Sequence, residues 1–189
     1  KSPILLGVLS LLIFSAPFRR LQNKTQVFPL PGSVFVHNRL THSLEVASVG
    51  RSLGDDVAKA LLERHPELQD SFLPEICSIV SAACLAHDLG NPPFGHSGEK
   101  AISTFFSEGK GVRLKEKQPN GEQLSPMEWE DLTHFEGNAN AFRILTHQFE
   151  GRRKGGFVLT YTTLASIVKY PFSSSLAGTK SKFGFFISE

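Results

Sequence analysis

Apolar positions recur at helical spacing along most of the chain, separated by short polar stretches. Residues three and four positions apart lie on one face of a helix, so this spacing marks a face that packs inward. Together with capping and stop residues, it predicts helices over residues 41–53, 55–64, 74–89, 97–106, 133–149 and 160–169. The sequence therefore indicates an all-α fold.

The first of these helices carries clear boundary residues. Thr41 is its expected N-cap, Glu45 lies near the capping-box position, and Gly54 is expected to end it. Its inward face is predicted to consist of Leu44, Val46, Ala47, Val49 and Leu53.

An apolar run from Ile4 to Ala16 precedes the first predicted helix. It is short for a membrane span, which needs about 20 apolar residues. No A-x-A cleavage site follows it, so a buried helix or strand is the favoured interpretation and a targeting segment is the alternative. We expect no membrane span, and we divide the chain into an atypical apolar segment over 1–13 and one folded unit over 14–189.

Residues 107–132 form a polar stretch that contains several glycines and prolines. This composition predicts a long loop or insertion, which could cover a substrate site. The tail after Pro171 is also predicted to be irregular.

Composition narrows the class of protein. The chain has 189 residues, a formal net charge of +2 and 40% hydrophobic residues, as is typical of a single folded domain. The charge alone is too small to predict nucleic-acid binding, although Arg152, Arg153 and Lys154 could hold a phosphate or form a solvated loop. The two cysteines, Cys77 and Cys84, are interpreted as core residues in a reducing compartment, which favours a cytoplasmic protein.

Three residues with metal-binding side chains form the main candidate site: His42, His87 and Asp88. The adjacent pair falls in the last turn of the helix over 74–89, and His42 falls in the first turn of another helix. Two imidazoles and a carboxylate suit a divalent metal that promotes hydrolysis, because they leave positions open for water and a substrate oxygen. His96 and Glu99 follow after a Gly-Asn-Pro-Pro-Phe-Gly turn that could fold them back over this site.

Five segments carry a more specific signal: FRRLQNKTQVF, NRLTHSLEVA, AHDLGNPPFGHSGE, FEGNANAFRIL and IVKYP. In this order they resemble the HD-domain deoxynucleoside triphosphate triphosphohydrolases, particularly bacterial dGTPases. The resemblance extends from Phe14 to nearly the end of the chain. It implies an all-helical HD-domain metallohydrolase that cleaves dGTP into deoxyguanosine and inorganic triphosphate.

The resemblance also implies roles for the candidate residues. His42, His87 and Asp88 would hold the metal, with Mg or Mn expected first and Fe, Co or Ni as alternatives. His96 would be the catalytic histidine, which protonates the leaving group or takes a proton from water. Glu99, three residues further along the same helix, would orient that imidazole.

Three further residues are implied to bind the substrate. Arg39, one turn ahead of His42, would bind the α-phosphate with its fork-shaped guanidinium. Gln26 matches the family glutamine that contacts the sugar, and its amide could bind a 3′-hydroxyl. For His134 two interpretations remain open: a second histidine that faces the phosphates, or an ordinary surface residue.

The family takes a fourth metal ligand, an aspartate, from a helix beyond the region YPFSS, and no matching aspartate precedes Glu189. We therefore expect the chain to be the N-terminal part of such an enzyme, and to bind metal weakly and lack activity alone. The resemblance further implies a dGTP or other dNTP substrate, a homo-oligomer, and single-stranded DNA as an effector. The alternatives are another HD-type nucleotide phosphohydrolase or phosphodiesterase, and an inactive protein that binds nucleotides or single-stranded DNA.

Overall fold

A computed structural model describes residues 3–25, 38–69, 71, 73–119, 121–151, 154–176 and 182–188. These residues form eight α-helices: α1 (Pro3–Ile13), α2 (Ala16–Arg20), α3 (Arg39–Arg64), α4 (Ile76–Ala86), α5 (His96–Ser107), α6 (Pro126–Thr133), α7 (Gly137–Thr146) and α8 (Tyr161–Ile167). They also form five 3-10 helices: η1 (Leu21–Asn23), η2 (Pro66–Leu68), η3 (Leu73–Glu75), η4 (Lys110–Lys115) and η5 (Ser174–Leu176). Within this part of the chain, β structure is limited to one isolated bridge between Ser173 and Phe185. The predicted all-α fold is confirmed.

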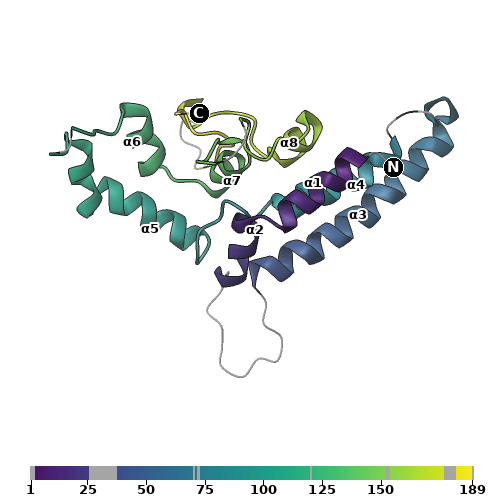
Figure 1. The fold of residues 1–189 in the computed structure, drawn as a ribbon, viewed down its shortest axis with the longest axis horizontal. Helices are drawn as coiled ribbons and strands as arrows, with labels where there is room; N and C mark the ends of the chain where they lie inside the picture. The colour runs from purple at the N-terminus through teal and green to yellow at the C-terminus, as the bar shows by residue number, and fades with distance from the viewer. Residues whose placement is uncertain are drawn as a thin grey trace, which may run out of the picture.

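One main core joins helices that are far apart in the sequence. The long helix α3 lies along α4, which also packs against α1, while α5 and α6 extend to the opposite side (Figure 1). Helices α7 and α8 and the end of the chain lie above the middle of the molecule. The largest apolar side chains that are fully buried are Phe18, Leu12, Leu21, Leu85, Leu89 and Leu145. Each contributes on the order of 1.5–3 kcal/mol by leaving water, which ties α1, α2, α4 and α7 together.

The apolar run near the N-terminus forms α1. Val8 and Leu12 are buried in the main core. Ser15 then turns the chain, because its hydroxyl donates to Leu12 O at 2.7 Å and accepts from Phe18 N at 3.2 Å as the N-cap of α2. This packing agrees with the interpretation as a buried helix. Among the described helices, none is both long and apolar enough to cross a membrane.

Helix α3 replaces two predicted helices, and its N-cap lies three residues before the predicted one. Its N-cap is Asn38, whose Oδ1 accepts from Thr41 N at 2.9 Å, while Thr41 Oγ1 accepts from Asn38 N at 3.2 Å. Thr41 is therefore the third residue of the helix in a capping box, and the prediction that it is the N-cap was wrong. The predicted break at Gly54 was also wrong, since the helix continues to Arg64.

The buried face of α3 consists of small residues rather than large ones. Its buried positions after the first turn are Ser43, Ala47, Gly50, Gly54 and Ala58. Leu44, Val49 and Leu53, which were predicted to face inward, are 41%, 60% and 59% exposed. The reason is the approach of α4: a Cβ atom on Gly54 would lie 2.7 Å from Cys77 Cα. Large side chains do not fit there, so they lie beside the contact.

Helix α4 is shorter than predicted. It begins at Ile76 after the 3-10 turn η3, and it ends at Ala86, so His87 is its C-cap and Asp88 lies beyond it. Within the described residues, neither Cys77 nor Cys84 forms a disulfide. Burial raises the pKa of the Cys84 thiol, which disfavours the reactive thiolate.

The stretch 107–132, predicted as a loop, contains η4 and part of α6. Ser125 caps α6 by accepting from Glu128 N at 3.2 Å, and Glu128 Oε2 accepts from Ser125 N at 2.8 Å. This Ser-Pro-Met-Glu capping box was present in the sequence but was hidden by the surrounding glycines and prolines. Helix α7 is shorter than the predicted helix over 133–149, and α8 agrees with its prediction and has Thr160 as N-cap.

Replacing Gly54 with Ala tests the contact between α3 and α4. The added methyl group would meet the Cys77 backbone at 2.7 Å, so the two helices must move apart. We expect the free energy of unfolding to fall by about 1–3 kcal/mol, the usual cost of overpacking, in urea titrations of the purified chain.

Gly7→Ala in α1 is the matched control, because nothing lies within 4 Å of a Cβ atom at that position. Removing a glycine from a helix should here raise the free energy of unfolding, by up to about 1 kcal/mol. Equal effects of the two substitutions would contradict the packing described for α3.

Candidate metal centre

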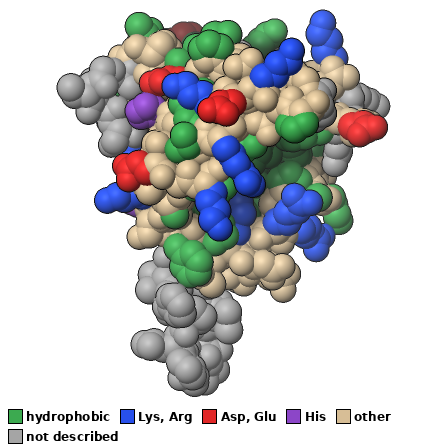
Figure 2. All heavy atoms as spheres, turned by 90° about the vertical axis from the view of Figure 1, so that its left-hand side faces the viewer, with side chains coloured by type: hydrophobic (Ala, Val, Ile, Leu, Met, Phe, Trp, Pro, Cys, Tyr) green, Lys and Arg blue, Asp and Glu red, His purple; other side chains and the backbone are tan. Residues whose placement is uncertain are grey.

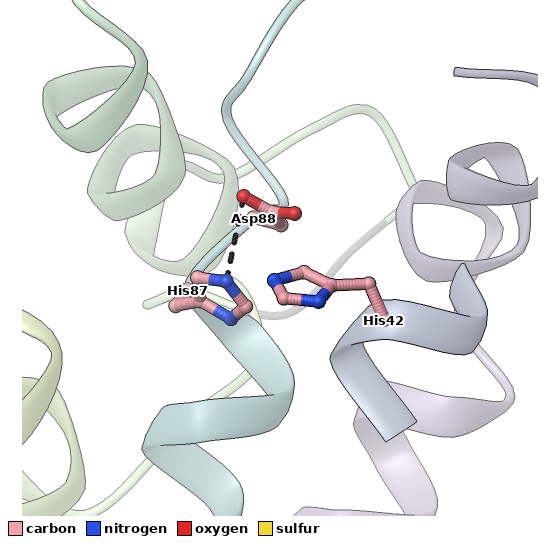
Figure 3. A group of neighbouring side chains, drawn as sticks. All are labelled: His42, His87 and Asp88. Carbon is pink, nitrogen blue, oxygen red and sulfur yellow. Dashed lines mark ion pairs between the residues drawn. The ribbon is translucent and has the colours of Figure 1, made fainter. Parts of the chain in front are cut away.

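The three predicted metal ligands meet where α3 and α4 lie side by side. His42 projects from the first turn of α3, and His87 and Asp88 follow the end of α4 (Figure 3). Their ligand atoms all lie within 4.8 Å of one another, and the two imidazole rings are edge to face with centroids 5.3 Å apart. Two imidazole nitrogens and a carboxylate oxygen at this spacing fit a divalent metal ion.

The tautomer of His87 is set by its backbone contact. Its Nδ1 lies 2.6 Å from the Cys84 carbonyl oxygen, which only accepts, so Nδ1 carries the proton and donates it. In the neutral ring, the form that binds a metal, Nε2 is then the nitrogen with the lone pair, and it lies 3.5 Å from Asp88 Oδ1. The ring therefore presents a lone pair toward the carboxylate and the proposed metal position.

Asp88 is buried, with 3% exposure, and neighbouring side chains fix its orientation. Its Oδ1 accepts from Arg39 Nη1 at 3.0 Å and from Asn91 Nδ2 at 2.6 Å. Arg39 is itself 4% exposed, and its Nε has no hydrogen-bond partner among the described residues. Arg39 thus holds the carboxylate of a candidate metal ligand, and its predicted contact with the α-phosphate stays a prediction.

The turn after Asp88 packs directly on the first turn of α7. A Cβ atom on Gly90 would overlap the Gly137 carbonyl oxygen and the Ala141 nitrogen, and one on Gly137 would overlap Asn91 Oδ1. Asn140 Nδ2 also donates to Gly90 O at 2.8 Å. The two glycines are therefore required by a close approach, which joins the segment HDLGN to the segment FEGNA.

His96 and Glu99 form a hydrogen-bonded pair on the first turn of α5. Their Nδ1 and Oε2 atoms are 2.7 Å apart, and Glu99 Oε1 accepts from Gly137 N at 2.9 Å. Both residues line a cavity of about 660 Å³ that His87 and Asp88 also line. The structure thus brings this pair into one cavity with His87 and Asp88, two of the three candidate metal ligands, as the turn between them suggested, while His42 is not part of the lining.

Lys182 joins this pair from the end of the chain, and the sequence reasoning missed it. Its Nζ donates to Glu99 Oε2 at 3.2 Å and to Glu136 Oε1 at 2.9 Å, and it lies 3.4 Å from His96 Nδ1. Glu136 is 1% exposed and caps α7, because its Oε2 accepts from the N–H groups of residues 138 and 139. Lys182 is 83 residues from Glu99 in a tail with no helical periodicity, so no sequence signal placed it here.

The charges of this cluster shift the pKa values of two groups. Burial by itself would raise the pKa of Glu99, but hydrogen bonds from His96 and Gly137 and the charge of Lys182 bring it below its ordinary value of 4.5. Burial would likewise lower the pKa of Lys182, but Glu136 and Glu99 outweigh it and raise that pKa. The carboxylate and the ammonium therefore stabilise each other's charged forms.

His134 does not meet the other candidates at this site. His134 has a side chain 60% exposed, with Nδ1 3.2 Å from Glu130 Oε1, and it does not line the cavity. Its surroundings fit the surface alternative. Gln26, Arg152 and Arg153 lie outside the described residues.

Comparison with known proteins identifies the class. Residues 39–169 match the HD domain, so the chain belongs to the HD domain family. It is 48% identical over 186 residues to a protein named deoxyguanosinetriphosphate triphosphohydrolase-like protein from Pseudomonas aeruginosa (strain LESB58), covering 94% of this chain and 39% of that protein. A protein of the same name from Synechocystis is 46% identical over 187 residues, covering 94% of this chain and 41% of that protein.

A third relative, named deoxyguanosinetriphosphate triphosphohydrolase, comes from Yersinia enterocolitica. It is 39% identical over 184 residues, covering 84% of this chain and 34% of that protein. The resemblance drawn from the sequence motifs is confirmed. The chain spans about two-fifths of the length of the first two relatives.

Replacing Asn91 with Ala tests the support of Asp88. Asn91 donates to Asp88 at 2.6 Å and need not touch the metal itself. Loss of such a supporting bond typically lowers metal affinity by about 10–100-fold, and we expect this for Mn²⁺ or Co²⁺ measured by calorimetry. Asn23→Ala, an exposed position on η1, is the control and should leave the affinity unchanged. Equal affinities for the two variants would refute the role of Asn91.

Replacing Glu99 with Gln tests the charge cluster through its pH dependence. Because the folded-state pKa of Glu99 is lowered, its carboxylate adds stability above the ordinary value of 4.5, and this is lost as pH falls through the folded pKa. The loss of unfolding free energy in the variant should therefore be largest near about pH 7 and shrink below about pH 4. Glu45→Gln, exposed on α3, should show no such trend. A loss independent of pH would argue against the cluster.

Proposed function

We propose that this protein hydrolyses dGTP, and other dNTPs to a degree still to be measured, to the deoxynucleoside and inorganic triphosphate. One observation carries the proposal: His87 and Asp88 line the same cavity of about 660 Å³ as the hydrogen-bonded pair His96 and Glu99. The cavity thus joins metal-binding groups to a proton-transferring group, as hydrolysis of a phosphate ester requires. The printed names of the relatives supply the substrate class.

His42, His87 and Asp88 are the residues that would hold the metal, with Mg or Mn expected first and Fe, Co or Ni as alternatives. When bound, a divalent metal supplies positive charge to the phosphate oxygens. Arg39 and Asn91 hold the Asp88 carboxylate in place. This support matters because a metal ligand that can rotate binds less tightly.

His96 is the group proposed to move a proton. Glu99 holds its Nδ1, which leaves Nε2 for the reaction. Water adds to the α-phosphorus, the bond from phosphorus to the 5′-oxygen breaks, and that oxygen must gain a proton. His96 gives this proton or takes one from the attacking water.

The cavity also contains groups suited to a triphosphate and a nucleoside. Lys169 and Lys182 line it and supply positive charge for a polyphosphate. Tyr170, also in the lining, offers a ring for an apolar or stacking contact, with Lys169 Nζ 5.5 Å from its centroid. The predicted sugar contact of Gln26 completes this proposal. The homo-oligomer, the single-stranded DNA effector and the cytoplasmic location stay predictions.

The proposal is tested by incubating the chain with each of the four dNTPs and Mg²⁺ or Mn²⁺, then separating products by ion exchange. A version extended to the length of the relatives is assayed in parallel, because this chain spans only about two-fifths of their length. We expect deoxyguanosine and intact triphosphate from the extended version. His96→Ala should lower kcat by about 10²–10⁴-fold, the usual contribution of general acid–base catalysis. His65→Ala, exposed at the end of α3, is the matched control.

The products discriminate between the function classes. Monophosphate with pyrophosphate, or cleavage of a phosphodiester, would assign the site to another HD-type reaction. Binding of nucleotide without turnover in either version would leave only a binding role. Full activity of His96→Ala would rule out His96 as the proton donor. It would not bear on the proposed metal site.

A further inference from the structure

A second and larger cavity lies next to the candidate metal centre. Its volume is about 950 Å³, and its lining includes residues of α1, α2, α7 and the segment that follows α7. Leu89 and Asn140 line it, whereas their sequence neighbours Asp88 and Ala141 line the cavity with His96. Among the described residues, the two cavities share no lining residue. The proposed hydrolysis therefore makes no use of this space.

The charged residues of this cavity are mostly basic. Arg20, Lys24 and Arg143 line it, and Glu150 is the one acidic residue among the described residues of its lining. Burial lowers the pKa of Lys24, and so do the nearby charges of Arg39 and Arg20. Like charges held this close repel one another, and a bound anion would relieve that repulsion.

Lys24 is placed to donate into the cavity. Among the described residues its ammonium group donates to Leu89 O at 3.3 Å, and an ammonium group has three donors. Arg20, in the last turn of α2, is exposed and carries a planar guanidinium that suits phosphate oxygens. These groups supply the chemistry of a phosphate site.

Apolar side chains form the rest of the lining. Leu11 and Val158 line the cavity and are 52% and 60% exposed, and Phe157 and Leu89 lie with them. Exposed apolar side chains beside fixed charges are typical of a site for a ligand with one apolar and one charged part. On the face drawn in Figure 2, hydrophobic side chains and several Lys and Arg side chains likewise lie beside one another.

We propose that this cavity is a second ligand site, which binds a small phosphate ester of mononucleotide size. The phosphate lies near Arg20, Lys24 and Arg143, and a flat apolar group lies against Leu11 and Phe157. A volume of about 950 Å³ is at the upper end of the range for small-molecule sites, so such a ligand fits. No metal ligand contributes, so binding needs no divalent ion.

The test measures binding of a fluorescent nucleoside diphosphate to the chain in excess EDTA, where the metal centre cannot contribute. Inorganic phosphate serves as the minimal competitor. Arg20→Glu and Arg143→Glu should each weaken binding by about tenfold or more, because a repulsive charge replaces an attractive one. Arg20 is exposed, so its variant should fold, and circular dichroism checks both.

Two control variants locate the bound probe. Arg51→Glu makes the same charge change on an exposed position of α3 that lines neither cavity, and it should leave the dissociation constant unchanged. His87→Ala alters the other cavity and should also bind normally. An equal loss of affinity in Arg51→Glu would show that the effect comes from the net charge of the protein and not from this cavity. A loss of affinity in His87→Ala would show that the probe binds at the metal centre.

Two further results would overturn the proposal: no binding at millimolar probe, or binding of a single-stranded oligonucleotide without binding of the mononucleotide. Because the assay contains no metal and no turnover, its failure would leave the proposed hydrolysis standing. Failure of the dNTP assay would equally leave this cavity to be judged by its own variants.

Discussion

The close contact between α3 and α4 is the constraint on which the site depends. The two helices approach until only small side chains fit between them, as Ala47 and Gly54 show. Ser81 of α4 then donates to the backbone oxygen of Ala47 at 3.1 Å, which a more distant pair could not do. At this separation His42 and His87 reach each other with ring centroids 5.3 Å apart. A larger residue in the interface would push the two helices apart and with them the two imidazoles.

The turn after α4 fixes the position of Asp88 and separates the two cavities. Asp88 is held by Arg39 and Asn91 on one side, while Leu89 enters the main core and borders the larger cavity. Lys24 donates to the carbonyl of Leu89, so the turn is fastened to the segment before α3 as well. A few consecutive residues thus separate two cavities of different character, one with two of the candidate metal ligands and one with basic and apolar groups.

The sequence predicted what is encoded locally and missed what depends on distance. His87 and Asp88 are adjacent, and His96 and Glu99 are three positions apart on one helix, so both pairs could be recognised from spacing. Lys182 could not, because its contact with Glu99 spans 83 residues and begins in an irregular tail. The predicted inward face of α3 was wrong for a related reason. Hydrophobicity favours large residues inside, and only the position of α4 shows that small ones are required.

The contact between Gly90 and Gly137 has a consequence for how this protein can evolve. A side chain at either glycine would push the segment after α4 away from the first turn of α7. That turn also donates the Gly137 N–H to Glu99, so the displacement would reach the His96–Glu99 pair as well as the candidate metal ligands. A change at one glycine therefore becomes tolerable only with compensating changes in the other segment. Substitutions in these two segments should therefore arise together during evolution, although the segments are far apart in the sequence.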